Sequence, residues 1–71
     1  MTTLAEAFRL TGKLFDDDVV FVRYGSESHD MTRILTVAGA KKLFDKNANV
    51  DSISAKFDDG DFVGYEYTLA G

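Results

Sequence analysis

The small size of the chain constrains its fold more than any other feature. With 71 residues it has room for one compact domain, residues 1–71, and one hydrophobic core, because a chain of this size hides only about 60% of its unfolded surface. Such a core rarely supplies more than about 3 to 5 kcal/mol, and there is no cysteine to add a disulfide. We therefore expect self-association, most simply as a homodimer, to contribute to stability.

The charge of the chain disfavours some classes of partner. Its 12 carboxylates outnumber its 8 lysines and arginines and give a net charge of −4, so the long-range field repels a phosphate backbone. No apolar run approaches the roughly 18 residues of a membrane-spanning helix, and residues 1–13 lack the apolar segment of a secretory signal. We expect a soluble cytoplasmic protein with no nucleic-acid partner and no membrane contact.

Two segments have helical periodicity. Thr3 and Glu6 fit a capping box, and apolar residues recur at helical spacing over residues 4–15. Gly12 weakens the last turn by about 1 kcal/mol relative to alanine, and the three aspartates at 16–18 end the helix. The pattern predicts a second, shorter helix over residues 38–46, with apolar residues inward and lysines outward.

Four segments have strand composition. Residues 19–24 and 31–37 flank a polar loop at residues 25–30, and residues 50–57 and 62–69 flank an Asp-Gly turn. The predicted fold is α+β: a small single domain in αββαββ order, with two helices packed on a four-stranded, mainly antiparallel sheet. The residues expected to be largely buried are Phe8, Phe15, Phe21, Leu35, Phe44, Ile53 and Tyr65.

The side-chain pattern of the second hairpin favours one register. A two-residue Asp-Gly turn would place Asp58 opposite Asp61, which pairs like charges. A three-residue loop with Gly60 in the left-handed conformation places Ile53 opposite Tyr65 instead. We predict this second register, with one face formed by Val63, Tyr65, Tyr67 and Leu69 and a more exposed face formed by Phe62, Gly64, Glu66 and Thr68.

A short sequence occurs twice. Residues 13–16 and residues 42–45 both read Lys-Leu-Phe-Asp, each at the predicted end of a helix. One interpretation is a duplicated αββ unit. We prefer the other, in which two helix ends share the same chemistry.

Residues 43–54 resemble the start of an EF-hand calcium loop. A Leu-Phe-Asp helix end is followed by side-chain oxygens at alternate positions. However, Val50 stands where the loop needs glycine, and Lys56 replaces the bidentate glutamate. We therefore interpret the segment as a polar turn between a helix and a strand, with weak calcium binding as the alternative.

The sequence does not indicate an enzyme. His29 is the only histidine, and although Ser28 and Asp30 flank it, a catalytic triad needs such groups to converge from rigid supports. One histidine without cysteines does not form the usual zinc site, and the glycines do not form a phosphate-binding loop. We predict no catalytic residue, metal site or cofactor, and we interpret His29 as a solvent-exposed loop residue.

Two acidic clusters and a group of aromatic residues are the remaining candidate binding features. The aspartates at 16–18 and those around residues 58–61 are interpreted as turns, with hard-cation ligation and phosphate mimicry as the alternatives. The strand aromatics resemble a base-stacking platform, but only Lys56 accompanies them near the last hairpin. We therefore assign these aromatics to core and interface packing.

The predicted function is that of a small acidic protein-interaction module. It would bind a protein partner, or itself, through a partly apolar sheet face or strand edge. The candidate partner-binding residues are Phe62, Tyr65, Tyr67, Asp58, Asp59 and Asp61. A DNA-mimicking inhibitor of a nucleic-acid-binding protein and a weak calcium or nucleic-acid binder are the alternatives, and the size and composition are typical of accessory proteins of phages and mobile elements.

Overall fold

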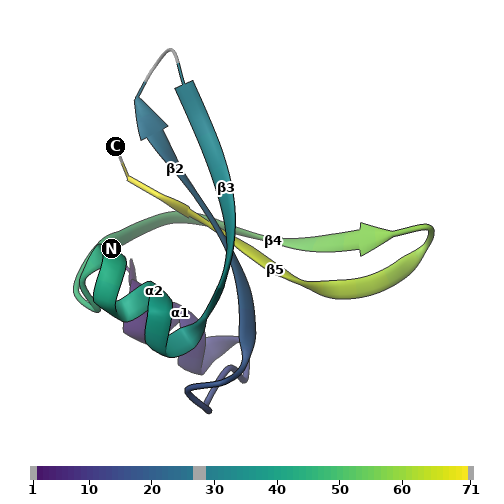
Figure 1. The fold of residues 1–71 in the computed structure, drawn as a ribbon, viewed down its shortest axis with the longest axis horizontal. Coiled ribbons are helices and arrows are strands. Elements are labelled where there is room, and N and C mark those ends of the chain that lie inside the picture. The colour runs from purple at the N-terminus through teal and green to yellow at the C-terminus, as the bar shows by residue number, and fades with distance from the viewer. Residues whose placement is uncertain (1, 27–28, 71) are drawn as a thin grey trace.

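A computed structural model describes residues 2–26 and 29–70 of the chain. These residues form two helices and a five-stranded mixed sheet (Figure 1). In chain order the elements are β1 (Thr2–Thr3), α1 (Leu4–Leu10), β2 (Val19–Ser26), β3 (His29–Thr36), α2 (Val37–Phe44), β4 (Asn49–Asp58) and β5 (Asp61–Leu69). The predicted α+β class with two helices is confirmed.

The strands lie in the order β1-β4-β5-β2-β3, so the two hairpins sit side by side in one sheet. They join through a parallel pairing of β2 with β5, in which Phe21 lies opposite Glu66. A fifth strand arises because Thr2 and Thr3 pair with the start of β4. The prediction of four mainly antiparallel strands is therefore only roughly correct, since neither a two-residue strand nor a pairing of distant segments has a local pattern.

Local side-chain chemistry defines both ends of α1. The Thr3 hydroxyl accepts a hydrogen bond from the Glu6 N–H (3.2 Å), so the predicted threonine cap is confirmed. The Glu6 carboxylate accepts from the Thr3 hydroxyl (3.1 Å) and not from its backbone N–H, so the capping box is present only in part. At the other end Gly12 takes a left-handed conformation, with φ 74°. Glycine favours this conformation just past a helix end. The helix therefore ends at Leu10, and its predicted extension to residue 15 is wrong.

The start of α2 is capped twice. The Thr36 hydroxyl accepts a hydrogen bond from an N–H in the first turn (3.1 Å). The N–H groups of Val37 and Ala38 donate to the carbonyls of Asp18 (2.9 Å) and Asp16 (3.1 Å). The first acidic cluster is thus a turn whose backbone satisfies the N-terminal N–H groups of α2.

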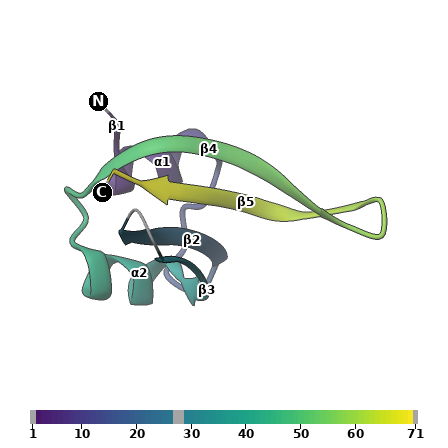
Figure 2. The ribbon, with the colours of Figure 1, turned by 90° about the horizontal axis from the view of Figure 1, so that it is seen from above.

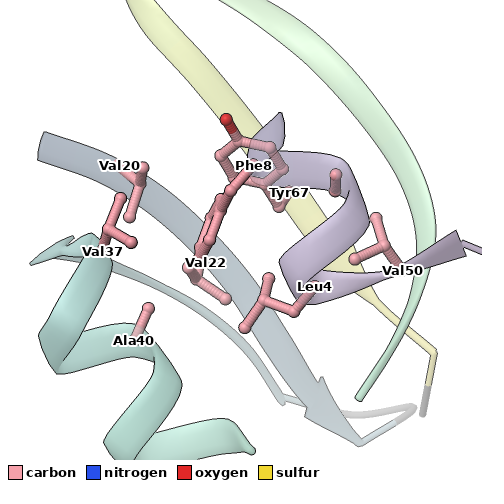
Figure 3. Packing of buried hydrophobic residues seen from close by; sticks show 9 residues of the cluster. Leu4, Phe8, Val20, Val22, Val37, Ala40, Val50 and Tyr67 are labelled. Atoms are coloured by element: carbon pink, nitrogen blue, oxygen red, sulfur yellow. The ribbon is translucent and has the colours of Figure 1, made fainter. Parts of the chain in front are cut away.

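Both helices cover the same face of the sheet, and the core lies between them and the strands (Figure 3). The ring of Tyr67 lies in the middle of this core, edge-to-face with Phe8 at a centroid distance of 5.0 Å. The buried hydrophobic residues of the core are Leu4, Ala7, Phe8, Val20, Val22, Val37, Ala40, Val50 and Tyr67. Small and β-branched side chains therefore make up most of the core.

The core differs from the one predicted. Phe8 is buried as expected, but Phe15 is 69% exposed, so that prediction is wrong. Because α1 ends at Leu10, Phe15 lies in the following loop instead of on the apolar stripe of a helix. Four of the other predicted residues are partly buried and pack against the core: Leu35, Phe44, Ile53 and Tyr65. Phe21 is also partly buried, but its ring packs over Gly64 and not in the core.

The β4–β5 hairpin turns through two residues. Asp59 and Gly60 both have positive φ, at 53° and 86°, as in the turns that match the twist of a hairpin. Asp58 lies opposite Asp61, so the predicted three-residue loop is wrong. The favourable geometry of the Asp-Gly turn outweighs a like-charge pair that is exposed to water.

A bulge corrects the register further along this hairpin. Val63 is an extra residue of β5, because Phe62 and Gly64 on either side of it pair with consecutive residues of β4. Ile53 consequently lies opposite Tyr67, where the uncorrected register would place a carboxylate. The bulge thus combines a tight turn with an apolar face directed at the core.

The two Lys-Leu-Phe-Asp sequences occupy different places. Residues 13–16 lie in the loop after α1, whereas residues 42–45 end α2 and enter the next turn. The two halves also join unequally, since the first strand of one hairpin pairs with the second strand of the other. The structure therefore gives the duplicated-unit interpretation no support.

Candidate interaction surface on the β4–β5 hairpin

The outer part of the β4–β5 hairpin projects from the rest of the protein. The pairing of β5 with β2 covers residues 66–68, and residues 55–65 extend beyond it as a two-stranded ribbon, which we call the arm. Figures 1 and 2 show from two directions that the arm reaches past both helices. Because a lone two-stranded ribbon is only marginally stable in water, contacts of the arm with a further surface would stabilise it.

Three aromatic residues form a patch on the side of the arm that continues the core face of the sheet. We call Phe57, Phe62 and Tyr65 the arm patch. The ring of Phe62 lies between the other two, with its centroid 5.9 Å from that of Phe57 and 5.1 Å from that of Tyr65. Phe57 is 63% exposed and Phe62 is 52% exposed, and the bulge residue Val63 beside them is also exposed. The rings thus support one another edge-to-face while much of their surface contacts water.

The predicted faces of β5 hold only in part. Tyr65 and Tyr67 share the core face as expected. Phe62 was predicted on the opposite face but packs against Tyr65, so this prediction is wrong. The extra residue Val63 changes the alternation between them, and a bulge has no distinct signature in the residue pattern.

Three aspartates surround the end of the arm. Asp58, Asp59 and Asp61 are all exposed, and residues 57–65 include no lysine or arginine. Asp59 tolerates the left-handed conformation of the turn better than most residues do. We call these three residues the acidic tip. The exposed arm patch therefore lies beside a negatively charged end, and residues 57–65 supply no cation to neutralise it.

The opposite face of the arm base is occupied by side chains of the chain itself. The Lys56 ammonium pairs with the Glu66 carboxylate at 2.9 Å and lies 5.6 Å from the centroid of the Phe21 ring. That ring packs over Gly64, where a Cβ atom would come within 3.1 Å of it. The one lysine of the arm therefore lies on the opposite face from the arm patch.

Tyr67 does not belong to the exposed surface. Its side chain is fully buried, and its hydroxyl lies 2.6 Å from the Thr11 hydroxyl. Burial raises the pKa of the Tyr67 hydroxyl above its usual value. A partner would have to open the core to reach it. Of the six sequence candidates, the structure brings five together on the arm and places Tyr67 in the core.

Sequence reasoning left Phe57 out of the candidate set, although it is the most exposed ring of the arm patch. The signal that could have found it was the Asp-Gly turn. In a two-residue turn, the residues that precede Asp58 and follow Asp61 face each other, and these are Phe57 and Phe62. The three-residue loop that we predicted does not place these two residues opposite each other, so the pair was missed.

The two acidic clusters lie in separate parts of the structure. Residues 16–18 lie in the loop that contacts the start of α2, whereas the acidic tip projects away from the helices (Figures 1 and 2). Mimicry of a nucleic-acid backbone by both clusters together requires that they share a face. The acidic tip is thus the cluster that lies beside the arm patch.

The EF-hand-like segment does not fold into an ion-binding loop. The Asp45 carboxylate accepts a hydrogen bond from the Asn47 N–H (3.0 Å), and from Asn49 onward the chain is an extended strand paired with β1. Calcium ligands must instead wrap around the ion. In residues 2–26 and 29–70 there is no group of three or more histidines or acidic residues arranged to hold a metal.

The predicted polar loop at residues 25–30 is shorter than expected. β2 continues to Ser26, and His29 begins β3. Residues 27–28 and the side chain of His29 lie outside the described part of the structure. The interpretation of His29 as a solvent-exposed loop residue therefore stays a prediction for its side chain.

Comparisons with known proteins assign no family to the chain. No family model matches it, and neither a curated protein nor a solved structure does. In the described residues no helix is long and apolar enough to cross a membrane. The function must therefore be argued from the arm and its surroundings.

Proposed function

We propose that the protein is a non-enzymatic interaction module that binds a protein surface through the arm patch. The observation that carries this proposal is the exposure of Phe57 and Phe62 on a projecting ribbon that neither helix covers. Contiguous exposed aromatic surface is costly in water and is enriched at protein interfaces. Phe57 packs against Phe62, which packs against Tyr65, and aromatic side chains of this kind are enriched at the centres of protein interfaces.

The acidic tip narrows the class of surface that would be bound. Carboxylates next to an apolar patch favour a partner whose apolar site is bordered by lysines or arginines. The same carboxylates, together with the net charge of −4, repel nucleic acid. The arm is a projecting ribbon, unlike the concave pockets that hold small substrates, which supports binding without catalysis. A DNA-mimicking role would use the same tip, but the separation of the two acidic clusters makes us favour a protein-binding surface.

A matched pair of variants tests the proposal. Phe57→Ser with Phe62→Ser removes the two exposed rings, while Ile34→Ser removes an apolar side chain of similar exposure from a different strand. Both variants would be compared with the wild-type chain for self-association and for cross-linked partners in a lysate of the source organism. We expect the arm variant to lose association at least about tenfold and the Ile34 variant to keep it.

Circular dichroism and thermal melts serve as the control that both variants are folded. The proposal is contradicted if the folded arm variant associates with itself and with other proteins as the wild type does. It is equally contradicted if the Ile34 variant loses as much association as the arm variant.

A further inference from the structure

The arm patch is not the only exposed apolar part of the protein. Only nine described residues are buried in the core, and two of them are alanines. Ten large apolar residues are at least 47% exposed: Leu10, Leu14, Phe15, Val19, Met31, Ile34, Leu43, Phe57, Phe62 and Val63. Association of subunits would cover such residues and stabilise a small core.

The helices carry exposed apolar residues as well. Leu10 is the most exposed of the ten, and it lines a shallow groove on α1 together with Glu6 and Arg9. Leu43 is half exposed on α2. We call the solvent side of α1 and α2 the helix surface. It lies on the same side of the sheet as the arm patch, because Tyr65 faces the core side of β5.

The helix surface and the arm have opposite charge. Five of the eight basic residues lie in the helices or within three residues of their C-terminal ends, and the acids of the same segments are Glu6 and Asp45. The aspartates at 16–18 lie instead at the N-terminal end of α2. These basic residues are Arg9, Lys13, Lys41, Lys42 and Lys46. The arm combines apolar side chains with carboxylates, and the helix surface combines apolar side chains with cations. The chain therefore contains two complementary surfaces.

We infer that the partner bound by the arm is a second copy of this chain, in a two-fold homodimer where the arm of each protomer lies across the helix surface of the other. The inference rests on the proposed function of the arm patch and names its occupant. In this arrangement Phe57 and Phe62 cover Leu10 of the partner copy. The acidic tip points toward Arg9 and the lysines of α2, away from the aspartates that follow Phe15.

Two-fold symmetry makes this arrangement closed. The two-fold rotation places the arm of each protomer on the helix surface of the other. Both arms and both helix surfaces are then covered, so no third copy is recruited. An arm cannot cover its own helix surface, because it extends away from both helices (Figures 1 and 2). Direct pairing of two arm tips would bring together six carboxylates, which is strongly unfavourable.

A charge-swap experiment tests the inference with the full chain. One variant reverses the tip with Asp58→Lys and Asp61→Lys, and the other reverses the helix surface with Arg9→Glu, Lys41→Glu and Lys42→Glu. Each variant alone places like charges in both interfaces of its dimer. An equimolar mixture restores opposite charges in both interfaces. Sedimentation velocity and native mass spectrometry measure the species present.

We expect the wild-type chain to be dimeric and each variant to bind itself at least about tenfold more weakly than the wild type binds itself. Mixing should give a 1:1 heterodimer, which also shows that both variants are folded. The wild-type dimer should weaken as salt rises from about 0.05 to about 0.5 M, since its interface charges are screened. Neutral Lys41→Gln with Lys42→Gln, which perturbs α2 less, should have an intermediate effect.

Three results would overturn the inference: a wild-type chain that stays monomeric at about 100 µM, dimers insensitive to both charge reversals, or a mixture that forms no heterodimer. These failures differ from failure of the proposed function. If the wild type is monomeric but the Phe57 and Phe62 variant still loses a cross-linked partner, the arm binds another protein and only the second-copy inference fails. If that variant loses no association of either kind, both fail.

Discussion

The buried hydrogen bond between Thr11 and Tyr67 permits a prediction whose sign can be worked out atom by atom. The Thr11 hydroxyl lies 2.8 Å from the Ala7 carbonyl and 2.6 Å from the Tyr67 hydroxyl. A carbonyl oxygen only accepts, so Thr11 donates to Ala7 and Tyr67 donates to Thr11. The two partners are therefore not equivalent, and removing one or the other should have different costs.

Thr11→Val leaves the fully buried Tyr67 hydroxyl without its acceptor, which should lower the free energy of unfolding by about 1 to 3 kcal/mol. Tyr67→Phe leaves no donor unsatisfied, because Thr11 still bonds to Ala7, and should cost about 0.5 to 1.5 kcal/mol. In the double variant the unsatisfied donor is gone. Its cost should fall below the sum of the single costs by about 1 kcal/mol or more.

Urea unfolding followed by circular dichroism at one fixed protein concentration measures all four chains of this cycle, and the fixed concentration keeps any contribution of association constant. The loss of the Thr11 bond to Ala7 occurs in both chains that carry valine, so it cancels from the coupling. Additive costs within about 0.3 kcal/mol would show that Tyr67 does not donate to Thr11. A Tyr67→Phe variant that loses association without losing stability would show that Tyr67 contacts a partner, as the sequence predicted.

Three further predictions follow from other contacts. Gly64→Ala should lower the free energy of unfolding by about 2 kcal/mol, because its Cβ would meet the Phe21 ring at 3.1 Å and its φ is 146°. Gly12→Ala, with open space around the Cβ and φ 74°, should lower it by only about 1 kcal/mol. Urea titration measures both, and equal losses would contradict the contact of Gly64 with Phe21. Because burial raises the pKa of Tyr67 in the folded state, stability from this group is full below about pH 10 and falls as the pH rises through the folded-state pKa, so the alkaline loss should be smaller in Tyr67→Phe. Millimolar calcium should leave the melting temperature unchanged, because the Asp45 carboxylate is bonded to backbone and the following residues form a strand; a clear calcium-dependent rise in differential scanning fluorimetry would refute this.

Local chemistry made most of the secondary structure predictable. The Thr3 cap, the β-branched segments and the Asp-Gly turn each depend only on neighbouring residues. The start of α1 and the bounds of β4 and β5 therefore lie close to those predicted from the sequence. The acidic tip and two of the three arm-patch residues were likewise identified from the sequence. Such features require only the geometry of a few consecutive residues.

Tertiary structure alone decided which of these residues face solvent. The bulge at Val63 turns Phe62 toward Tyr65, and the parallel pairing of β2 with β5 places Tyr67 under α1. Both depend on contacts between segments far apart in the chain, which compete for one small core. The aromatic residues of β5 look alike in the sequence, but the position of the helices buries Tyr67 and leaves Phe62 exposed. The sequence by itself therefore determined the elements, the turn and the charge of the tip, whereas only packing between distant segments decided which aromatic residues form the core and which form the arm patch.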